Sequence, residues 1–239
     1  MAGHPAALLF DVFGTVVDWR GSVIAAGDEL QQRLGLEVDW GTFANEWRTE
    51  GYLAPIMDMF NGQREWAPVD RLLTDQLDVL VDRYRLGGLT GDDRRHLLSV
   101  WRRLTPWPDA VEGLTRLKAR YLIGPLSNGG FALLAEMAKA AGLPWDFVIS
   151  AESFMAYKPS PAVYRGAVHL LERVPDEVML VAAHPGDLDA ARAAGMQTGY
   201  VPRPLEWGPD TALPDPDANT ERFDIVADDF GDLASKLGA

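Results

Sequence analysis

The stretch that decides the fold is 9–19, LFDVFGTVVDW. An apolar run ends at Asp11, and Gly14 and Thr15 follow at once as a tight turn. Aspartate commonly initiates turns, so a structural role is one interpretation of Asp11. The other is a carboxylate nucleophile that forms an ester with its substrate. The choice between them depends on what the rest of the chain brings to the same place.

Four further apolar runs end, like 7–11, in small or polar residues, and they span 121–127, 147–150, 178–183 and 197–201. The segments between them are rich in alanine and leucine and end at glycine, as helices do. Strands that alternate with helices predict an α/β fold, a Rossmann-like parallel sheet with helices on both faces. Ligands of such sheets bind at the carboxyl ends of the strands, where Asp11, Ser127 and the loop 183–187 are expected.

Residues 18–104 have helical spacing and little strand character. We interpret them as a helical cap subdomain inserted into a catalytic core formed by 1–17 and 105–239. The proline-rich stretch 202–220 is predicted to be a long surface loop, and 223–239 a last strand and helix.

Composition narrows the classes of function. The chain of 239 residues is 47% hydrophobic and has a net charge of −13, which argues against a nucleic-acid or anionic-membrane partner. The absence of cysteine excludes a thiolate nucleophile, a disulfide framework and a thiolate zinc site. No apolar run is long enough to span a membrane, and the start does not resemble a signal peptide, so a cytoplasmic protein is expected.

Polar residues follow other predicted strands. Ser127 and Asn128 lie in LSNGG, Lys158 precedes a proline in MAYKPSPAVY, and Asp187 lies in VAAHPGDLDAARAAG. Each has an ordinary structural alternative: a turn, a solvated lysine or a helix N-cap. A lysine that points into a strand-end crevice is instead a natural counter-charge for a carboxylate nucleophile or an anionic substrate.

Taken in order, these four segments resemble the four motifs of the haloacid dehalogenase superfamily, and the resemblance extends over nearly the whole chain, cap included. Phosphatases of that superfamily carry a second acid two residues after the nucleophile and hold magnesium with further acids in the fourth motif. Here Phe13 and Ala183 stand at two of those positions, which leaves a hard cation poorly held.

The pattern is instead similar to the L-2-haloacid dehalogenase branch, in which the position of Phe13 is commonly aromatic or uncharged. A departing halide needs neither a proton nor a metal, so no cofactor and no metal are expected. The implied activity is hydrolysis of short 2-halo carboxylic acids to 2-hydroxy acids. The alternatives are another metal-independent hydrolase of a small acid, such as a strained-ring acid, a magnesium-dependent phosphatase, or a silent binding protein. A homodimer is a further possibility.

The resemblance also implies roles for individual residues. Asp11 is the nucleophile, with Thr15 hydrogen-bonding nearby, and Ser127 and Lys158 hold the substrate carboxylate and orient Asp11. The expected substrate or halide contacts are Val12, Phe13, Trp47, Arg48, Asn128 and Tyr164. Arg48 as a solvated charge and Tyr164 as an ordinary buried aromatic are the alternatives.

The fourth motif departs from the well-known members, which have Ser-Ser-Asn where this chain has Ala182, Ala183 and His184. The serine and asparagine assist hydrolysis of the ester in those enzymes. Asp187 is therefore expected to activate water, with His184 as a candidate to take over part of that role through its ring nitrogens.

Overall fold

The computed structural model describes residues 4–209 and 220–239. Its core is a parallel sheet of six strands in the order β5-β4-β1-β6-β7-β8. Strand β1 lies at the centre and pairs with β4 and β6, which confirms the predicted α/β class. The strands are β1 (Ala7–Phe10), β4 (Leu122–Ser127), β5 (Ile149–Ser150), β6 (Val178–Ala182), β7 (Gln197–Tyr200) and β8 (Ile225–Val226).

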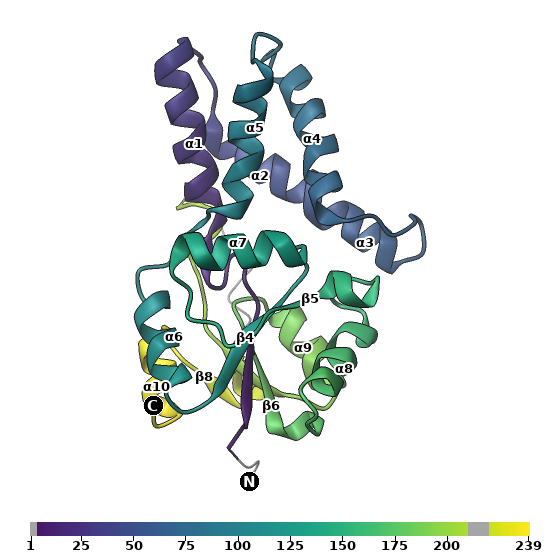
Figure 1. The fold of residues 1–239 in the computed structure, drawn as a ribbon, viewed down its shortest axis with the longest axis vertical. Coiled ribbons are helices and arrows are strands. Elements are labelled where there is room, and N and C mark those ends of the chain that lie inside the picture. The colour runs from purple at the N-terminus through teal and green to yellow at the C-terminus, as the bar shows by residue number, and fades with distance from the viewer. Residues whose placement is uncertain (1–3, 210–219) are drawn as a thin grey trace.

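Helices cover both faces of the sheet (Figure 1). Strands β1 and β6 are buried along their whole length because the layers on both sides exclude water from them. In Figure 1, α6 and α10 lie on one side of the sheet and α8 and α9 on the other. The core helices are α6 (Ala110–Lys118), α7 (Phe131–Ala141), α8 (Pro161–Leu170), α9 (Pro185–Ala193) and α10 (Phe230–Lys236).

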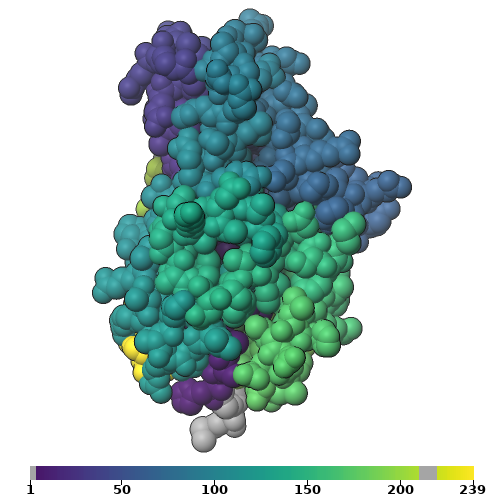
Figure 2. Space-filling view, viewed as in Figure 1, coloured from purple at the N-terminus to yellow at the C-terminus, as the bar shows by residue number. Residues whose placement is uncertain are grey.

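A group of helices leaves the core between two short strands, β2 (Val17–Asp18) and β3 (Thr105–Pro106), which pair antiparallel. Figures 1 and 2 show this group seated on the end of the core where α7 lies. We propose that these helices form a cap subdomain of residues 18–104 on a core formed by the rest of the chain. The helices are α1 (Trp19–Leu34), α2 (Trp40–Arg48), the π-helix η1 (Thr49–Leu53), α3 (Ala54–Phe60), α4 (Val69–Arg83), α5 (Gly91–Ser99) and the 3₁₀ turn η2 (Val100–Arg102).

The stretch after β7 differs from its prediction as a surface loop. Arg203 donates to the backbone oxygen of Thr15 over 2.9 Å, and Glu206 is only 3% exposed. The side chains of Arg203 and Glu206 are therefore packed into the protein. Arg203 binds the turn after β1, and Glu206 binds Trp19 and His184. Residues 210–219 of the predicted loop lie outside the described residues.

Short elements complete the chain trace, and they are the 3₁₀ turns η3 (Ala151–Phe154), η4 (Pro175–Glu177) and η5 (Thr220–Arg222). Among all the helices of the two described ranges, none combines the length and apolar character that crossing a membrane requires.

Candidate active site

The turn after β1 presents Asp11 at the carboxyl end of the central strand. The backbone N–H of Asp11 still donates to the oxygen of Val181 on β6, over 3.0 Å, so the side chain starts from a rigid position. Gly14 then turns the chain with φ of 89°, a conformation that favours glycine. A Cβ on Gly14 would also lie 2.0 Å from Oε1 of Glu206, so glycine is needed for this close approach.

Both carboxylate oxygens of Asp11 accept hydrogen bonds. Oδ2 accepts from the Thr15 hydroxyl over 2.7 Å and lies 3.1 Å from Nδ1 of His184, while Oδ1 accepts from Lys158 over 2.9 Å. Burial raises the pKa of Asp11, but the charge of Lys158 and the bond to His184 outweigh it and hold that pKa below its ordinary value. Asp11 is therefore a buried, ionised carboxylate.

Lys158 bridges two carboxylates. Its Nζ donates to Asp11 and, over 2.5 Å, to Oδ2 of Asp187, whose Oδ1 accepts from the Tyr164 hydroxyl over 2.6 Å. Burial lowers the pKa of Lys158, but these two negative charges outweigh it and raise that pKa. The Asn128 side chain exchanges two hydrogen bonds with the Lys158 backbone, of 2.7 and 3.3 Å, and so fixes the loop that carries the lysine.

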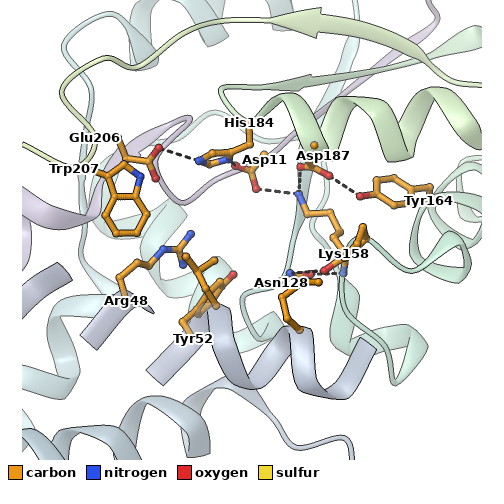
Figure 3. Close-up of a pocket in the computed structure, with 14 residues that line it drawn as sticks. Asp11, Arg48, Tyr52, Asn128, Lys158, Tyr164, His184, Asp187, Glu206 and Trp207 are labelled. Carbon is orange, nitrogen blue, oxygen red and sulfur yellow. Dashed lines mark hydrogen bonds and ion pairs between the residues drawn. The ribbon is translucent and has the colours of Figure 1, made fainter. Parts of the chain in front are cut away.

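His184 lies between two carboxylates (Figure 3). Nδ1 faces Asp11, and Nε2 lies 2.9 Å from Oε2 of Glu206, whose other oxygen accepts from Trp19 over 3.0 Å. Burial lowers the pKa of His184, but the charge of Glu206 and the bonds to both acids raise it to about 10. The ring is thus an imidazolium at neutral pH, with both nitrogens donating.

Arg48 enters the pocket from the cap. It ends α2, is 4% exposed, and places its guanidinium carbon 3.9 Å from the ring centroid of Tyr52 and 5.3 Å from that of Phe13. Its Nε and Nη1 are buried and find no hydrogen-bond partner within the described part of the chain. A buried guanidinium with unpaired donors is suited to bind an anion.

These groups line one pocket of about 330 Å³, to which both the strand-end loops and the inserted helices contribute. Its charged side chains are three cations, Arg48, Lys158 and His184, and three acids, Asp11, Asp187 and Glu206. The other lining residues are Tyr52, Leu53, Met57, Asn128, Pro159, Tyr164, Gly186 and Trp207.

The pocket brings together most of the residues that the sequence singled out. Those that line it are Asp11, Arg48, Asn128, Lys158, Tyr164, His184 and Asp187. Thr15 lies behind Asp11, where its hydroxyl donates to the carboxylate and accepts from the Ala183 N–H over 2.9 Å.

Four residues that we expected to contact substrate do not line the pocket: Val12, Phe13, Trp47 and Ser127. All four are buried. Ser127 accepts from the Gly129 N–H over 3.2 Å, and Trp47 donates to the Leu73 backbone over 2.9 Å. Phe13 forms T-shaped ring contacts with Tyr52 and Trp101. The structure thus places these four behind the lining of the pocket, and a contact of any of them with substrate stays a prediction.

Sequence reasoning missed Tyr52, Glu206 and Trp207. Tyr52 is four residues after Arg48, so the spacing could have predicted that both lie on the same helix face. Glu206 and Trp207 follow the end of β7, where ligands of such sheets are expected, but nothing in the proline-rich stretch around them indicates which side chains turn inward.

Residues 5–195 match the family of haloacid dehalogenase-like hydrolases. The chain is 30% identical over 201 residues to (S)-2-haloacid dehalogenase 4A of Burkholderia cepacia, with 82% of this chain and 83% of that protein covered. A solved structure of a defluorinating L-2-haloacid dehalogenase superposes with a TM-score of 0.90 at 43% identity, over 98% of this chain and 96% of that one. Another L-2-haloacid dehalogenase structure gives 0.91 at 41% identity, over 98% and 99%. With the turn that carries Asp11, the bridging lysine and the inserted helices all in place, the chain belongs to the haloacid dehalogenase-like hydrolases, in the branch of the L-2-haloacid dehalogenases.

Proposed function

We propose that this protein is a hydrolytic dehalogenase of short 2-halo carboxylic acids, which it converts to 2-hydroxy acids through an ester on Asp11. One observation carries the proposal: an ionised, buried carboxylate lies in a small pocket together with Arg48, whose Nε and Nη1 have no hydrogen-bond partner among the described residues. Such a pair suits a displacement in which negative charge moves from the nucleophile to a departing anion.

In the first step an oxygen of Asp11 attacks C2 of the substrate from the side opposite the halogen. The new C–O bond forms as the carbon–halogen bond breaks, and the halide leaves with the bonding electrons toward Arg48 and Asn128. No proton moves to the leaving group, which agrees with the apolar ring of Phe13 in place of a general acid. Backside attack inverts the configuration at C2.

In the second step water attacks the ester carbonyl of Asp11. The expected base was Asp187, but Lys158 and Tyr164 occupy its two oxygens. His184 instead places Nδ1 3.1 Å from Asp11, and Glu206 supports its other nitrogen. We therefore assign the water step to His184 and propose Asp187 as a positioning residue for Lys158.

Incubation with chloroacetate tests both steps. His184→Gln should release about one halide per active site and then stop, with a carboxymethyl ester accumulating, as expected for a blocked covalent intermediate. Intact-protein mass spectrometry would show the adduct and peptide mapping would place it on Asp11. Asp11→Asn should release no halide, because a neutral amide is a poor nucleophile. His169→Gln, an exposed histidine on α8, is the matched control and should turn over normally.

Two outcomes would contradict the mechanism. One is an adduct on a residue other than Asp11. The other is repeated turnover by Asp11→Asn protein that mass spectrometry shows to be still an amide.

Each alternative function predicts a different result in the same assay. A magnesium-dependent phosphatase needs acids where this chain has Phe13 and Ala183, and the two acids that remain, Asp11 and Asp187, are bridged by Lys158. The residues present therefore do not fit a divalent cation, and halide release should persist in excess chelator. A hydrolase of another small acid would form no carboxymethyl ester, and a binding protein would turn nothing over.

Two further expectations stay predictions, a cytoplasmic location and a homodimer. Light scattering on the eluting protein would determine the oligomeric state.

A further inference from the structure

The His184 ring is held by two acids from different parts of the chain. Asp11 follows β1 and contacts Nδ1, whereas Glu206 follows β7 and contacts Nε2. Both acids are buried, at 7% and 3% exposed. While both are ionised, neither ring nitrogen has a lone pair available for a water molecule, so the ring cannot act as a base.

The charges around the ring balance in the resting pocket. Asp11 and Glu206 contact His184. Lys158 binds Asp11 and also Asp187. The positive charge of Arg48 stabilises the ionised form of Glu206. With His184 protonated, the three cations and three acids sum to zero. Alkylation leaves this sum unchanged, because the substrate brings its own carboxylate, but it changes one contact of the ring: the ester group on Asp11 is neutral and no longer attracts the proton on Nδ1.

We propose that alkylation of Asp11 itself releases His184 to act as the base, so that the nucleophile masks the base until the ester has formed. This inference rests on the proposed function. Before the first step Asp11 keeps the imidazolium charged. After it, the ring has lost one of its two acidic partners while the side chain stays only 36% exposed, and partial burial of a cation favours loss of the proton.

The proton balance is definite. Ester formation releases halide, and Nδ1 gives its proton to solvent, so the first step yields one halide and one proton. Nδ1 then takes a proton from water as the oxygen attacks the ester carbonyl. The tetrahedral intermediate collapses by breaking the bond to the substrate oxygen, which takes up the remaining proton of the attacking water. The 2-hydroxy acid leaves, and Asp11 and the His184 imidazolium are restored.

In this scheme Glu206 is a positioning residue. Its contact with Nε2 keeps the remaining proton on that nitrogen, which directs the lone pair of the neutral ring to Nδ1, on the side of the ester. Trp19 in turn fixes Glu206 from the other side.

Asp11→Asn replaces the carboxylate by a neutral group of nearly the same shape. It therefore reports the state in which Nδ1 has lost its acidic partner. The titration of His184 can be followed by NMR of ring-labelled histidine, assigned by the signal missing in His184→Gln, since the chain has four histidines. We expect the midpoint in Asp11→Asn to fall by about one to three pH units from the wild-type value. Asp187→Asn removes a charge from the same pocket at a side chain that binds Lys158 and Tyr164 rather than the His184 ring, and it should shift the midpoint less. An unchanged midpoint in Asp11→Asn would overturn the inference.

The timing of proton release is a second test and uses the wild-type enzyme. A single turnover of chloroacetate with a pH indicator should show one proton appearing together with the halide. A proton that appears only with the hydroxy acid would refute masking, although the ester and the halide burst would still support the proposed function. Absence of the ester would instead refute the proposed function. In His184→Gln we expect the halide burst without its proton.

Discussion

Phe13 stands two residues after Asp11, where phosphatases of the superfamily have a second acid. Its ring does not reach the pocket but packs against Tyr52 and lies 5.3 Å from the Arg48 guanidinium. In place of a proton donor, this position supplies one of the aromatic rings that pack around the buried guanidinium of Arg48. Attraction of a cation to the faces of aromatic rings is strongest where water is excluded.

Arg48 is the residue on which departure of the halide is expected to depend. Arg48→Lys keeps the charge but loses the planar fork of donors and its fit on the rings. Loss of one preorganised donor to developing charge typically costs about 10²–10³ in turnover, and we expect a fall of that size for Arg48→Ala and a substantial fall for Arg48→Lys. Steady-state halide release measures it. Arg64→Lys, an exposed cap arginine, is the control. Near-normal turnover of Arg48→Ala would show that the halide site lies elsewhere.

Among the elements, the π-helix η1 has a direct effect on the site. It begins one residue after Arg48 and carries Tyr52, whose ring then lies under the guanidinium, and Leu53, which lines the pocket. Single π turns within helices frequently occur at functional sites. Gly51 permits close contact with α4, because a Cβ there would lie 2.6 Å from the Gln76 side chain. The π turn and the close contact at Gly51 therefore support the segment that holds Tyr52 against Arg48.

Tyr52→Leu should loosen Arg48 without removing its charge. A desolvated cation–π contact is worth about 2 kcal/mol, so inhibition by product halide should weaken by roughly tenfold or more, with a parallel fall in turnover. Tyr52→Phe retains the ring and should stay much closer to wild type. If both variants bound halide equally well, the ring would not be what positions Arg48.

At the scale of the whole molecule, one ion pair ties several segments to the turn after β1 that carries Asp11. Arg203, after β7, makes two 2.8 Å bonds to Asp109, which precedes α6, and a third bond to the Thr15 backbone. Asp109 also accepts from the Phe230 N–H, at the start of α10, over 2.9 Å. The link holds the stretch that carries Glu206 against the turn that carries Asp11.

Asp109→Asn should destabilise the fold by about 2–3 kcal/mol, because it leaves a largely buried guanidinium without its charge partner. Burial raises the pKa of Asp109, but the bonds from Arg203 and Phe230 outweigh it and lower that pKa. The carboxylate thus stabilises the fold above its unfolded pKa, near 4, and this stabilisation is lost as the pH falls through the lower folded value. Thermal unfolding of both proteins should show a difference at pH 7 that shrinks below about pH 4. Asp189→Asn, from the exposed pair with Arg222, should cost less than about 1 kcal/mol. A pH-independent difference would contradict this account.

Local patterns in the chain were enough to predict the parallel sheet and the meeting of Asp11, Asn128, Lys158 and Asp187. Parallel strands place their carboxyl ends at one edge, so residues that follow separate strands converge whatever the intervening sequence. Arg48 was expected from the family resemblance instead, and the structure brings it to that edge.

Long-range packing decided which partner each of these groups has. Glu206 meets Trp19 across 187 positions and His184 across 22, and no periodicity or turn signal encodes either meeting. The same packing occupies both oxygens of Asp187 and withdraws Phe13 and Ser127 from the pocket. Sequence patterns record which residues form a strand, a helix or a turn, because those depend on near neighbours. The partner of a buried charge depends instead on the path of a loop that is held in place only when the rest of the protein has folded.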